Sequence, residues 1–290
     1  MPAYTAKLKP NLSWPVHMPD IAGIDSGLTL KKPTSGVCRT GDNGFVIGHT
    51  YIDKLSRSQL LLPVSRFDCL GIDAPILPKN TLHYHPRPVE SLFMRGDFQK
   101  RCKPGASHVV GTGQALRRSG CDTAIQFAAE TYAQGLYPYP RVQIDQNIVE
   151  AFPNAFLGVM LDQQVIDKAS PSRGKKTDVF FSLCNAHGAF KALEQHLGWQ
   201  DADFWAEFPR TTNHDDLAAL VCAATAVCAH LGKYVAVGDM FGGYFFLPPW
   251  PLWKPWAKQA VEVARKENDF CGIVNLWINS EVFCTNDQLP

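Results

Sequence analysis

Short apolar runs, bounded by Gly, Pro and polar residues, follow one another through the first quarter of the chain. Three of these runs predict strands: IAGIDSGLTL (21–30), GFVIGHTYI (44–52) and FDCLGIDAPIL (67–77). The first and third runs each carry one aspartate in their second half, Asp25 and Asp73. Because ligands of open sheets sit beyond the carboxyl ends of the strands, both aspartates are candidates for a functional site.

Apolar residues at helical spacing dominate farther along the chain. They predict helices over 121–137, after Pro153, before Gly198, over 211–232 and over 255–269. Further strands are predicted just before Pro153, within 234–250 as a late strand or hairpin, and at GIVNLWI (272–278). Strands followed by alternating helices indicate an α/β fold.

No internal repeat, low-complexity tract or linker divides the sequence, so we expect a single domain over 1–290. Within it, 78–141 is rich in Arg, Lys, His, Gly and Pro and predicts an irregular, basic insertion after the third strand. Residues from about 250 to 290 are expected to add a C-terminal helix and strand.

Composition adds limits to this picture. With 290 residues, of which 46% are hydrophobic and 19% charged, the chain can bury a full core and is typical of a globular protein. The formal net charge of +1 neither supports nor excludes a nucleic-acid partner. Any phosphate-rich ligand therefore has to be met by a local basic patch.

The nine cysteines are odd in number and form no CxxC pair, which favours reduced, mostly buried thiols over a disulfide framework or a zinc site. The N-terminal residues have no apolar signal region, and no stretch approaches the roughly 18 uninterrupted apolar residues of a membrane span. We therefore expect a cytoplasmic protein without a membrane segment.

Two adjacent acids, Asp215 and Asp216, precede the apolar helix of TTNHDDLAALVCAATAVCAHLG (211–232). An aspartate is a common helix N-cap, which would account for one of them. If the first and third strands are neighbours and this helix packs across them, the helix acids converge with Asp25 and Asp73. Such a cluster is costly unless it is paired or binds metal, and its oxygen ligands select Mg²⁺ or Mn²⁺.

Two such ions about 3.5 to 4 Å apart can clamp a phosphodiester, which is the chemistry of a nuclease. The helix N-terminus favours ionised carboxylates, so the acids would remain ligands at neutral pH. We predict Asp25, Asp73 and Asp215 as metal ligands, with Asp216 as a further catalytic candidate.

Several short segments in order carry a resemblance to a known family: IAGIDSG, LGIDAPIL, RPVESLF with GDFQKRCKPG, VEAFPNA, NHDDLAALVCAATA and GDMFGGYFFLP. The chain resembles the RNase H-like fold, its RuvC-type resolvases, and more closely the family catalogued as domain of unknown function 429, predicted RNase H-like nucleases. The resemblance implies a mixed sheet flanked by helices and a metal-dependent nuclease site at Asp25 and Asp73. The family pattern has a second helix acid three residues after the first, where this chain has Ala218.

Accessory candidates surround this set. Glu150, in VEAFP, is either a further site acid or a local cap, and His214 is expected to bind a carboxylate or a phosphate. Arg87, Lys175 and Lys176 are substrate-binding candidates if they flank the acids. Two weaker candidates stay open: His83 and His85 as metal ligands or surface residues, and the tryptophans of LPPWPLWKPW (247–256) as base-stacking or packing residues.

The leading hypothesis is a Mg²⁺- or Mn²⁺-dependent hydrolase of DNA or RNA. A binding or scaffold protein on the same fold is the alternative, which Ala218 would suit. An actin-like or sugar-kinase-like ATPase ranks last, because GIDSGLT resembles a phosphate loop of that fold while GIDAPIL lacks the second loop.

Overall fold

The computed structural model of the chain describes residues 18–27, 34–63, 66–76, 86–102, 106–127, 147–170, 172, 175–239, 242–267, 275–279, 281–283 and 289–290.

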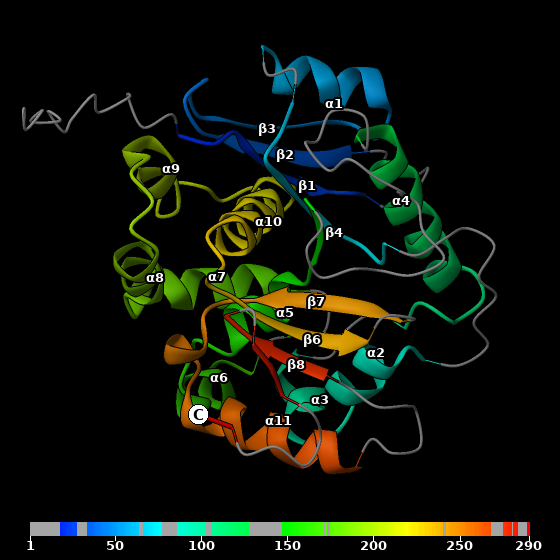
Figure 1. Ribbon diagram of the computed structural model, residues 1–290, viewed down its shortest axis with the longest axis vertical. Helices are drawn as coiled ribbons and strands as arrows, with labels where there is room; N and C mark the ends of the chain where they lie inside the picture. The colour runs from blue at the N-terminus through cyan, green and yellow to red at the C-terminus, as the bar shows by residue number, and fades with distance from the viewer. Residues whose placement is uncertain are drawn as a thin grey trace, which may run out of the picture.

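The strands in this described part form one mixed sheet of nine, in the order β3-β2-β1-β4-β5-β7-β6-β8-β9 (Figure 1). Strands β1, β2 and β3 make an antiparallel meander, β4 and β5 extend it in parallel with β1, and β6 to β9 complete the sheet with β7 parallel to β5. The strands are β1 (Ile21–Asp25), β2 (Thr34–Thr40), β3 (Val46–Tyr51), β4 (Cys69–Asp73), β5 (Ile148–Ala151), β6 (Val235–Asp239), β7 (Gly243–Leu247), β8 (Asn275–Ile278) and β9 (Glu281–Phe283).

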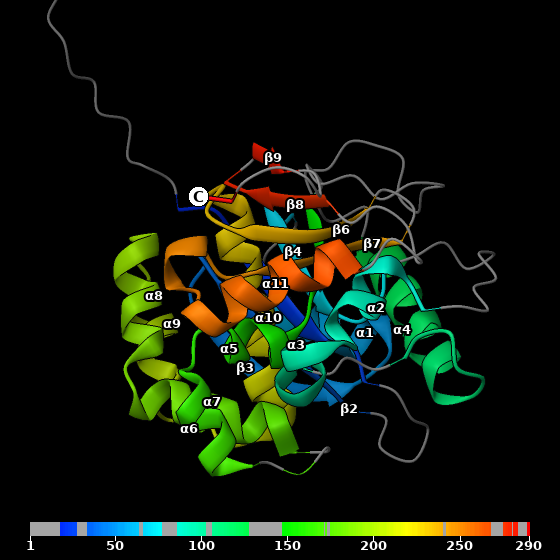
Figure 2. The ribbon, with the colours of Figure 1, turned by 90° about the horizontal axis from the view of Figure 1, so that it is seen from below.

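Helices cover both faces of the sheet. On one face, α10 (His214–His230) crosses β1, β2, β4 and β5, and on the other α1 (Lys54–Leu61) packs on β2 and β3 and α4 (Thr112–Phe127) on β4. Figure 2 shows α11 (Pro255–Glu267) beside α3 (Gly96–Cys102), and both pack together with α2 (Pro88–Phe93). The remaining helices are α5 (Pro153–Gly158), α6 (Gln163–Ala169), α7 (Lys176–Ala186), α8 (Ala189–Leu197), α9 (Ala202–Glu207) and the short 3₁₀ helix η3 (Trp250–Leu252).

Side chains alternate between the two faces along each strand. Ile24 and Ile72 belong to a small core with residues of α1 and α4, whereas the larger core lies on the α10 face. The neighbours that follow them, Asp25 and Asp73, therefore point to the α10 face of the sheet. This alternation decides which helix the two acids meet.

Close contact between α10 and the sheet depends on glycine. A Cβ atom at Gly36 would lie 1.9 Å from the backbone oxygen of Asp215, and one at Gly71 would lie 2.1 Å from that of Cys222. Any side chain at these two positions would push the helix off the sheet. The first turn of α10, with its acids, is thereby held against the end of β1.

The helix α10 is apolar on all sides because it is buried on nearly all sides, as a fully buried helix requires. Its N-cap is Asn213, whose side chain accepts hydrogen bonds from the backbone N–H groups of Asp215 and Asp216. The interpretation of an aspartate as the cap is therefore wrong. Both acidic side chains are free for other contacts.

Several predicted elements are confirmed, including the strand and helix around Pro153, the hairpin of β6 and β7, and α11. The structure adds β2 and α1, which the hydrophobic pattern did not indicate. The segment before Gly198 is two helices, α7 and α8, separated by a turn at Gly188, which has a φ of 70°.

The prediction of an irregular insertion over 78–141 is wrong for its described part. That part contains α2, α3 and α4, and it buries Phe93 and Phe98 completely in the main core. Its basic residues are not all a solvated face either, since Arg101 is 3% exposed and binds Asp97 and Asp167. The many polar residues of this segment made its few buried apolar positions, such as Phe93 and Phe98, hard to recognise in the sequence.

The tryptophans of 247–256 pack the C-terminal segment onto the domain, as the second interpretation of that segment expected. Trp250, Trp253 and Trp256 are buried, and each indole N–H donates to a backbone carbonyl. Seven cysteines lie in the described residues, where all are buried and no disulfide joins any two of them. Within the same residues, no helix combines the length and apolarity needed to cross a membrane.

Candidate functional site

A cleft of about 270 Å³ opens at the carboxyl ends of β1, β4 and β5. Both faces of the sheet contribute to it, together with the first turns of α5, α7 and α10. Its lining residues are Asp25, Ser26, Asp73, Ala74, Pro75, Arg87, Glu90, Leu116, Glu150, Ala151, Phe152, Pro153, Asn154, Thr177, His214 and Phe245. The cleft thus lies where the strand ends predicted a site.

Asp25 and Asp73 form the floor of this cleft. They are register partners on the parallel strands β1 and β4, so their side chains leave the sheet side by side. Burial raises the pKa of Asp25 to about 6, with a further contribution from the charge of Asp215. Burial and the charge of Asp25 raise the pKa of Asp73 well above its ordinary value. The charge of Asp25 thus disfavours the ionisation of Asp73.

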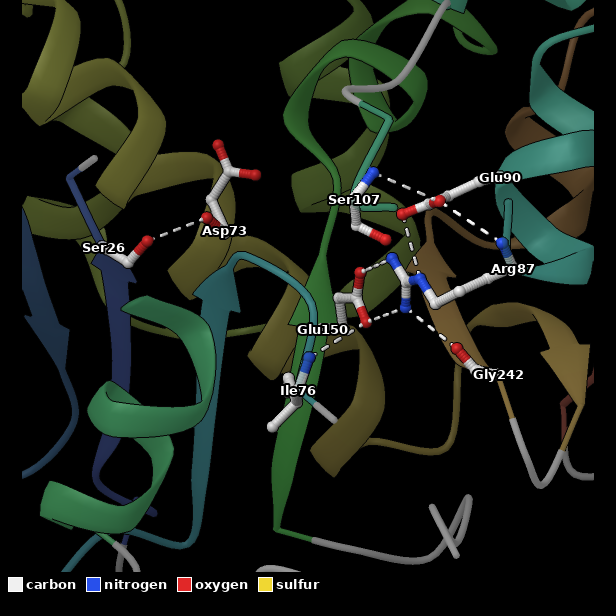
Figure 3. A network of polar contacts seen from close by, with 8 residues as sticks. All are labelled: Ser26, Asp73, Ile76, Arg87, Glu90, Ser107, Glu150 and Gly242. Carbon is white, nitrogen blue, oxygen red and sulfur yellow. Dashed lines mark hydrogen bonds and ion pairs between the residues drawn. The ribbon is translucent and has the colours of Figure 1, made fainter. Parts of the chain in front are cut away.

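Within the part of the chain that the structure describes, neither floor acid has a cationic partner. Among the described residues, Asp25 and Asp73 form no ion pair, and no hydrogen bond reaches the carboxylate of Asp73, which points away from the other side chains drawn in Figure 3. From the described residues, the carboxylate of Asp25 accepts a long hydrogen bond, at 3.5 Å from the N–H of Gly27. Their oxygens are therefore open to a ligand in the cleft.

The backbones of the floor acids are fixed by hydroxyl groups. Ser35 donates to the carbonyl of Asp25, and Ser26 donates to the carbonyl of Asp73 at 3.2 Å. Behind them the buried Arg57 donates to the carbonyl of Ser26 at 2.6 Å and to side chains of β2 and α4. Arg57 thus braces the end of β1 without binding the Asp25 carboxylate, and the sequence analysis missed it.

The two acids of α10 separate in the structure. Asp215 lies close enough to Asp25 for its charge to raise the pKa of Asp25. Asp216 instead accepts from Nδ1 of His49 on β3 at 3.2 Å, if that nitrogen carries a proton. Neighbouring residues in a helix point about 100° apart, so the Asp216 side chain contacts β3 while Asp215 faces Asp25. Of the two, only Asp215 stays a candidate for the site.

His214 lines the cleft from the start of α10. Its Nδ1 contacts a carboxylate oxygen of Asp178 on α7 at 2.5 Å, which leaves Nε2 as the free ring nitrogen. Although burial opposes it, the bond to Asp178 together with the charges of Asp178, Asp25 and Asp215 raises the pKa of His214. The expectation that His214 binds a carboxylate is confirmed, with Asp178 as the partner.

Arg87 and Glu150 form the wall opposite the floor (Figure 3). The guanidinium of Arg87 binds both carboxylate oxygens of Glu150, at 2.7 and 2.8 Å, and its Nε donates to Glu90 at 3.0 Å. It also donates to the carbonyl of Gly242 at 2.9 Å. Arg87 lines the cleft and is only 2% exposed, and its donors bind the protein's own acids. Its role in substrate binding stays a prediction.

Glu150 is likewise committed within the protein. Besides Arg87, it accepts from the backbone N–H of Ile76 at 3.3 Å. Burial raises the pKa of Glu150, and the bond and charge of Arg87 oppose that shift. The interpretation of Glu150 as a local hydrogen-bond acceptor is therefore the one that its contacts favour.

The other basic and histidine candidates lie outside the cleft lining or outside the described residues. Lys175 is exposed just before α7, and Lys176 donates to the carbonyl of Lys100 at 2.6 Å. Their neighbour Thr177 lines the cleft, but neither lysine is among its lining residues. His83 and His85 fall outside the described residues.

The donor set fits a divalent cation through two carboxylates. No group of three or more His, Cys, Asp or Glu in the described ranges is placed to hold an ion, so Asp215 does not complete a three-ligand site with Asp25 and Asp73. Mg²⁺ is usually bound through one or two carboxylates, with water and substrate phosphate oxygens as its other ligands. The open, hard oxygen atoms of Asp25 and Asp73 meet that description.

Polar side chains from α5 and α7 line another side of the cleft, and no sequence pattern predicts them. Asn154 follows Pro153 in α5, and its side-chain oxygen accepts from the hydroxyl of Thr177 at 2.9 Å. Both line the cleft, but no motif or spacing in the sequence joins two positions more than twenty residues apart. Only the packing of α5 against α7 brings them together.

Comparisons of the chain with family models, with curated proteins and with solved structures find no match. The geometry of the cleft therefore carries the functional interpretation.

Proposed function

We propose that the protein is a Mg²⁺- or Mn²⁺-dependent phosphodiesterase that acts on nucleic acid. The observation that carries the proposal is the pair Asp25 and Asp73, which lie in register on adjacent parallel strands with oxygens open to the cleft. Buried carboxylates without a cationic partner are costly, and a functional cation offsets that cost.

The arrangement of elements supports an RNase H-like fold for this chain. The acids come from a first strand, from the parallel strand beside it, and from the start of a late buried helix across the sheet. This is the order of acids on which the resemblance to RNase H-like nucleases rests. The three-stranded antiparallel meander extended by parallel strands is a mixed sheet of the expected kind.

The charge of the cleft explains why such an activity would need a cation. Its lining holds four carboxylates, those of Asp25, Asp73, Glu90 and Glu150, against the single guanidinium of Arg87. A phosphodiester is itself anionic and would be repelled. A bound divalent cation would supply the charge that holds the phosphate and activates water for attack.

The chain's own residues would orient the substrate around that position. His214 lines the cleft, and its Nε2 is the ring nitrogen that the contact with Asp178 leaves available to bind a phosphate oxygen. Asn154 and Thr177 offer polar groups in the same cleft, and Lys175 and Lys176 precede Thr177 in the chain. The acids hold the cation while these groups hold the phosphate.

The test is hydrolysis of labelled single-stranded and double-stranded DNA and RNA with Mg²⁺, with Mn²⁺ and with a chelator. We expect metal-dependent cleavage that is lost in Asp25→Asn and in Asp73→Asn. Asp162→Asn is the matched control, because Asp162 is exposed and pairs with Lys254 far from the floor acids. Full activity in Asp25→Asn, or cleavage that persists in chelator, would contradict the proposal.

A non-catalytic nucleic-acid-binding protein on the same fold is the second candidate. Ala218 favours it, since this position holds an acid in the family pattern and the third acid, Asp215, does not group with the floor pair. Binding of the same substrates at physiological salt, without cleavage in either metal, would support this candidate over the hydrolase.

A further inference from the structure

We infer that the site takes one divalent cation and not two, and that Arg87 is the residue that keeps Glu150 from serving as a ligand. The inference rests on the proposed function, because it concerns the cation of the same cleft. It departs from the two-ion arrangement that the acid cluster in the sequence predicts.

The row of acids along the strand ends stops after two strands. Asp25 on β1 is the register partner of Asp73 on β4. On β5 the register partner of Ile72 is Glu150, so the position level with Asp73 is the next residue, Ala151. Ala151 lines the cleft and is 2% exposed. A methyl group thus stands where a third carboxylate of the row would be.

Glu150 is offset from that row by the alternation of side chains. As partner of Ile72, which packs toward α4, it leaves the sheet on the face opposite to Asp73. It comes close enough at the strand end for its charge to raise the pKa of Asp73. Glu150 is therefore near the floor acids, and its contacts decide whether it can act with them.

Those contacts leave no oxygen of Glu150 free. Each oxygen accepts from a different nitrogen of Arg87, and one also accepts from the N–H of Ile76. Bidentate arginine pairs are among the strongest hydrogen-bonded ion pairs, and at 5% exposure water competes little with this one. The positive guanidinium contacts both oxygens and would repel a cation at the same carboxylate, so Glu150 is a poor ligand while Arg87 stays in place.

Arg87 is held from its other side as well. Its Nε donates to Glu90, which also accepts from the backbone N–H of Ser107 at 3.4 Å, and one NH group donates to Gly242. The side chain therefore ties α2 to β5 and to the turn between β6 and β7. Moving it away from Glu150 would break contacts in three segments at once.

Asp216 offers no substitute ligand, because His49 binds it on the β3 side of α10. The carboxylates that remain open are Asp25 and Asp73, with Asp215 nearby. Two carboxylates completed by water and substrate oxygens suit a single Mg²⁺ or Mn²⁺. A second ion would lack protein ligands in the described part of the cleft.

The first test is a titration of the full wild-type chain with Mn²⁺ alone, with free ion followed by electron paramagnetic resonance and heat by calorimetry. We expect one ion per chain. Two ions of comparable affinity would overturn the inference, and this measurement does not depend on how any variant folds. No binding at all would contradict the proposed function and this inference together.

The second test compares two isosteric variants. Asp73→Asn should raise the Mn²⁺ dissociation constant at least about tenfold, whereas Glu150→Gln should leave it within about threefold of wild type. Glu150→Gln keeps Arg87 paired with Glu90, so the fold should persist, which circular dichroism checks. A tenfold or greater loss of affinity in Glu150→Gln would overturn the inference. One-ion binding without hydrolysis of any substrate would leave the inference standing and contradict only the proposed function.

Discussion

Two pairs of acids line the same cleft and differ in whether a positively charged side chain binds them. Asp25 and Asp73 on the floor have no cationic partner in the described residues, whereas Glu90 and Glu150 on the wall enclose Arg87. The comparison teaches that the presence of a carboxylate at a strand end does not make it a ligand. What its oxygens already bind decides whether it can hold a cation or only holds the fold together.

The difference comes from neighbouring elements and not from the acids themselves. The floor acids face the start of α10, which brings another carboxylate, Asp215. The wall acids meet the arginine that begins α2. The floor acids are costly to ionise when buried, and a bound cation would offset that cost. The wall acids stabilise the fold only while Arg87 is present to pair with them.

The largest expected effect is on the wall. Arg87→Ala should lower the free energy of unfolding by about 3 to 5 kcal/mol, because it leaves two buried carboxylates without their cationic partner. Chemical denaturation measures this loss. Arg118→Ala, on the exposed side of α4, is the control and should change stability by no more than about 0.5 kcal/mol. If Arg87→Ala changed the free energy of unfolding as little as the control, the wall acids would not depend on Arg87 and would not differ from the floor acids.

On the floor, the expected effect is on activity and not on stability. Asp73→Asn should reduce kcat for metal-dependent hydrolysis by about 10² to 10³-fold, comparable to the loss of one preorganised electrostatic group. Without metal, the same variant should be at least as stable as wild type, since it removes a like-charge neighbour of Asp25. Steady-state kinetics and denaturation test both parts, and a strongly destabilised Asp73→Asn would mean that the floor acid is structural.

The metal-free protein should lose stability as the pH rises. Asp25 has a pKa of about 6 in the folded chain against 3.8 when unfolded, so the folded state binds the extra proton between these values. Its contribution is complete below pH 4 and is lost as the pH passes 6, up to about 3 kcal/mol in all. Denaturation midpoints from pH 4 to 7.5 in chelator measure it.

Two further measurements test whether Asp25 and Asp73 cause this pH dependence. Asp25→Asn should flatten the pH dependence, and Mn²⁺ should stabilise the wild type most near neutral pH, where the acids are ionised. Equal pH profiles for the variant and the wild type would show that Asp25 does not titrate as described.

A smaller effect is expected where α10 meets the sheet. Gly36→Ala should cost about 1 to 3 kcal/mol, because the new methyl group would overlap the backbone oxygen of Asp215. It should also lower activity by shifting Asp215 away from Asp25. Gly48→Ala on β3 is the matched control, since its Cβ would find its nearest neighbour at an ordinary 3.8 Å. Similar results for the two variants would contradict the close approach of helix and sheet.

The smallest effect on stability and activity is expected at Asp216, whose side chain faces β3 and not the cleft. Asp216→Asn should change stability by less than about 1 kcal/mol, because its partner His49 is half exposed and such pairs contribute little. Hydrolysis should stay near the wild-type rate. A loss of activity as large as that of Asp73→Asn would return Asp216 to the site.

The sequence by itself determined two strands that carry an aspartate and the buried helix. The apolar runs around Asp25 and Asp73 locate the two strands, although β1 and β4 end at these aspartates, earlier than the runs indicate. The unbroken apolar stretch after Asp216 indicates a helix buried on all sides. These are local patterns, because burial of a strand or helix demands apolar residues at a set period. The strand β2 escaped because TSGVCRT mixes polar residues and glycine with few apolar positions.

Only the tertiary structure decided which acids act together. Asp215 and Asp216 are adjacent in the chain, yet one faces Asp25 and the other faces His49, as the pitch of a helix requires. Glu150 and Arg87 are 63 positions apart and bind each other directly, which no spacing in the sequence indicates. Long-range packing joins residues that the chain keeps apart, so pairing, and with it the division between ligand and brace, is a property of the fold.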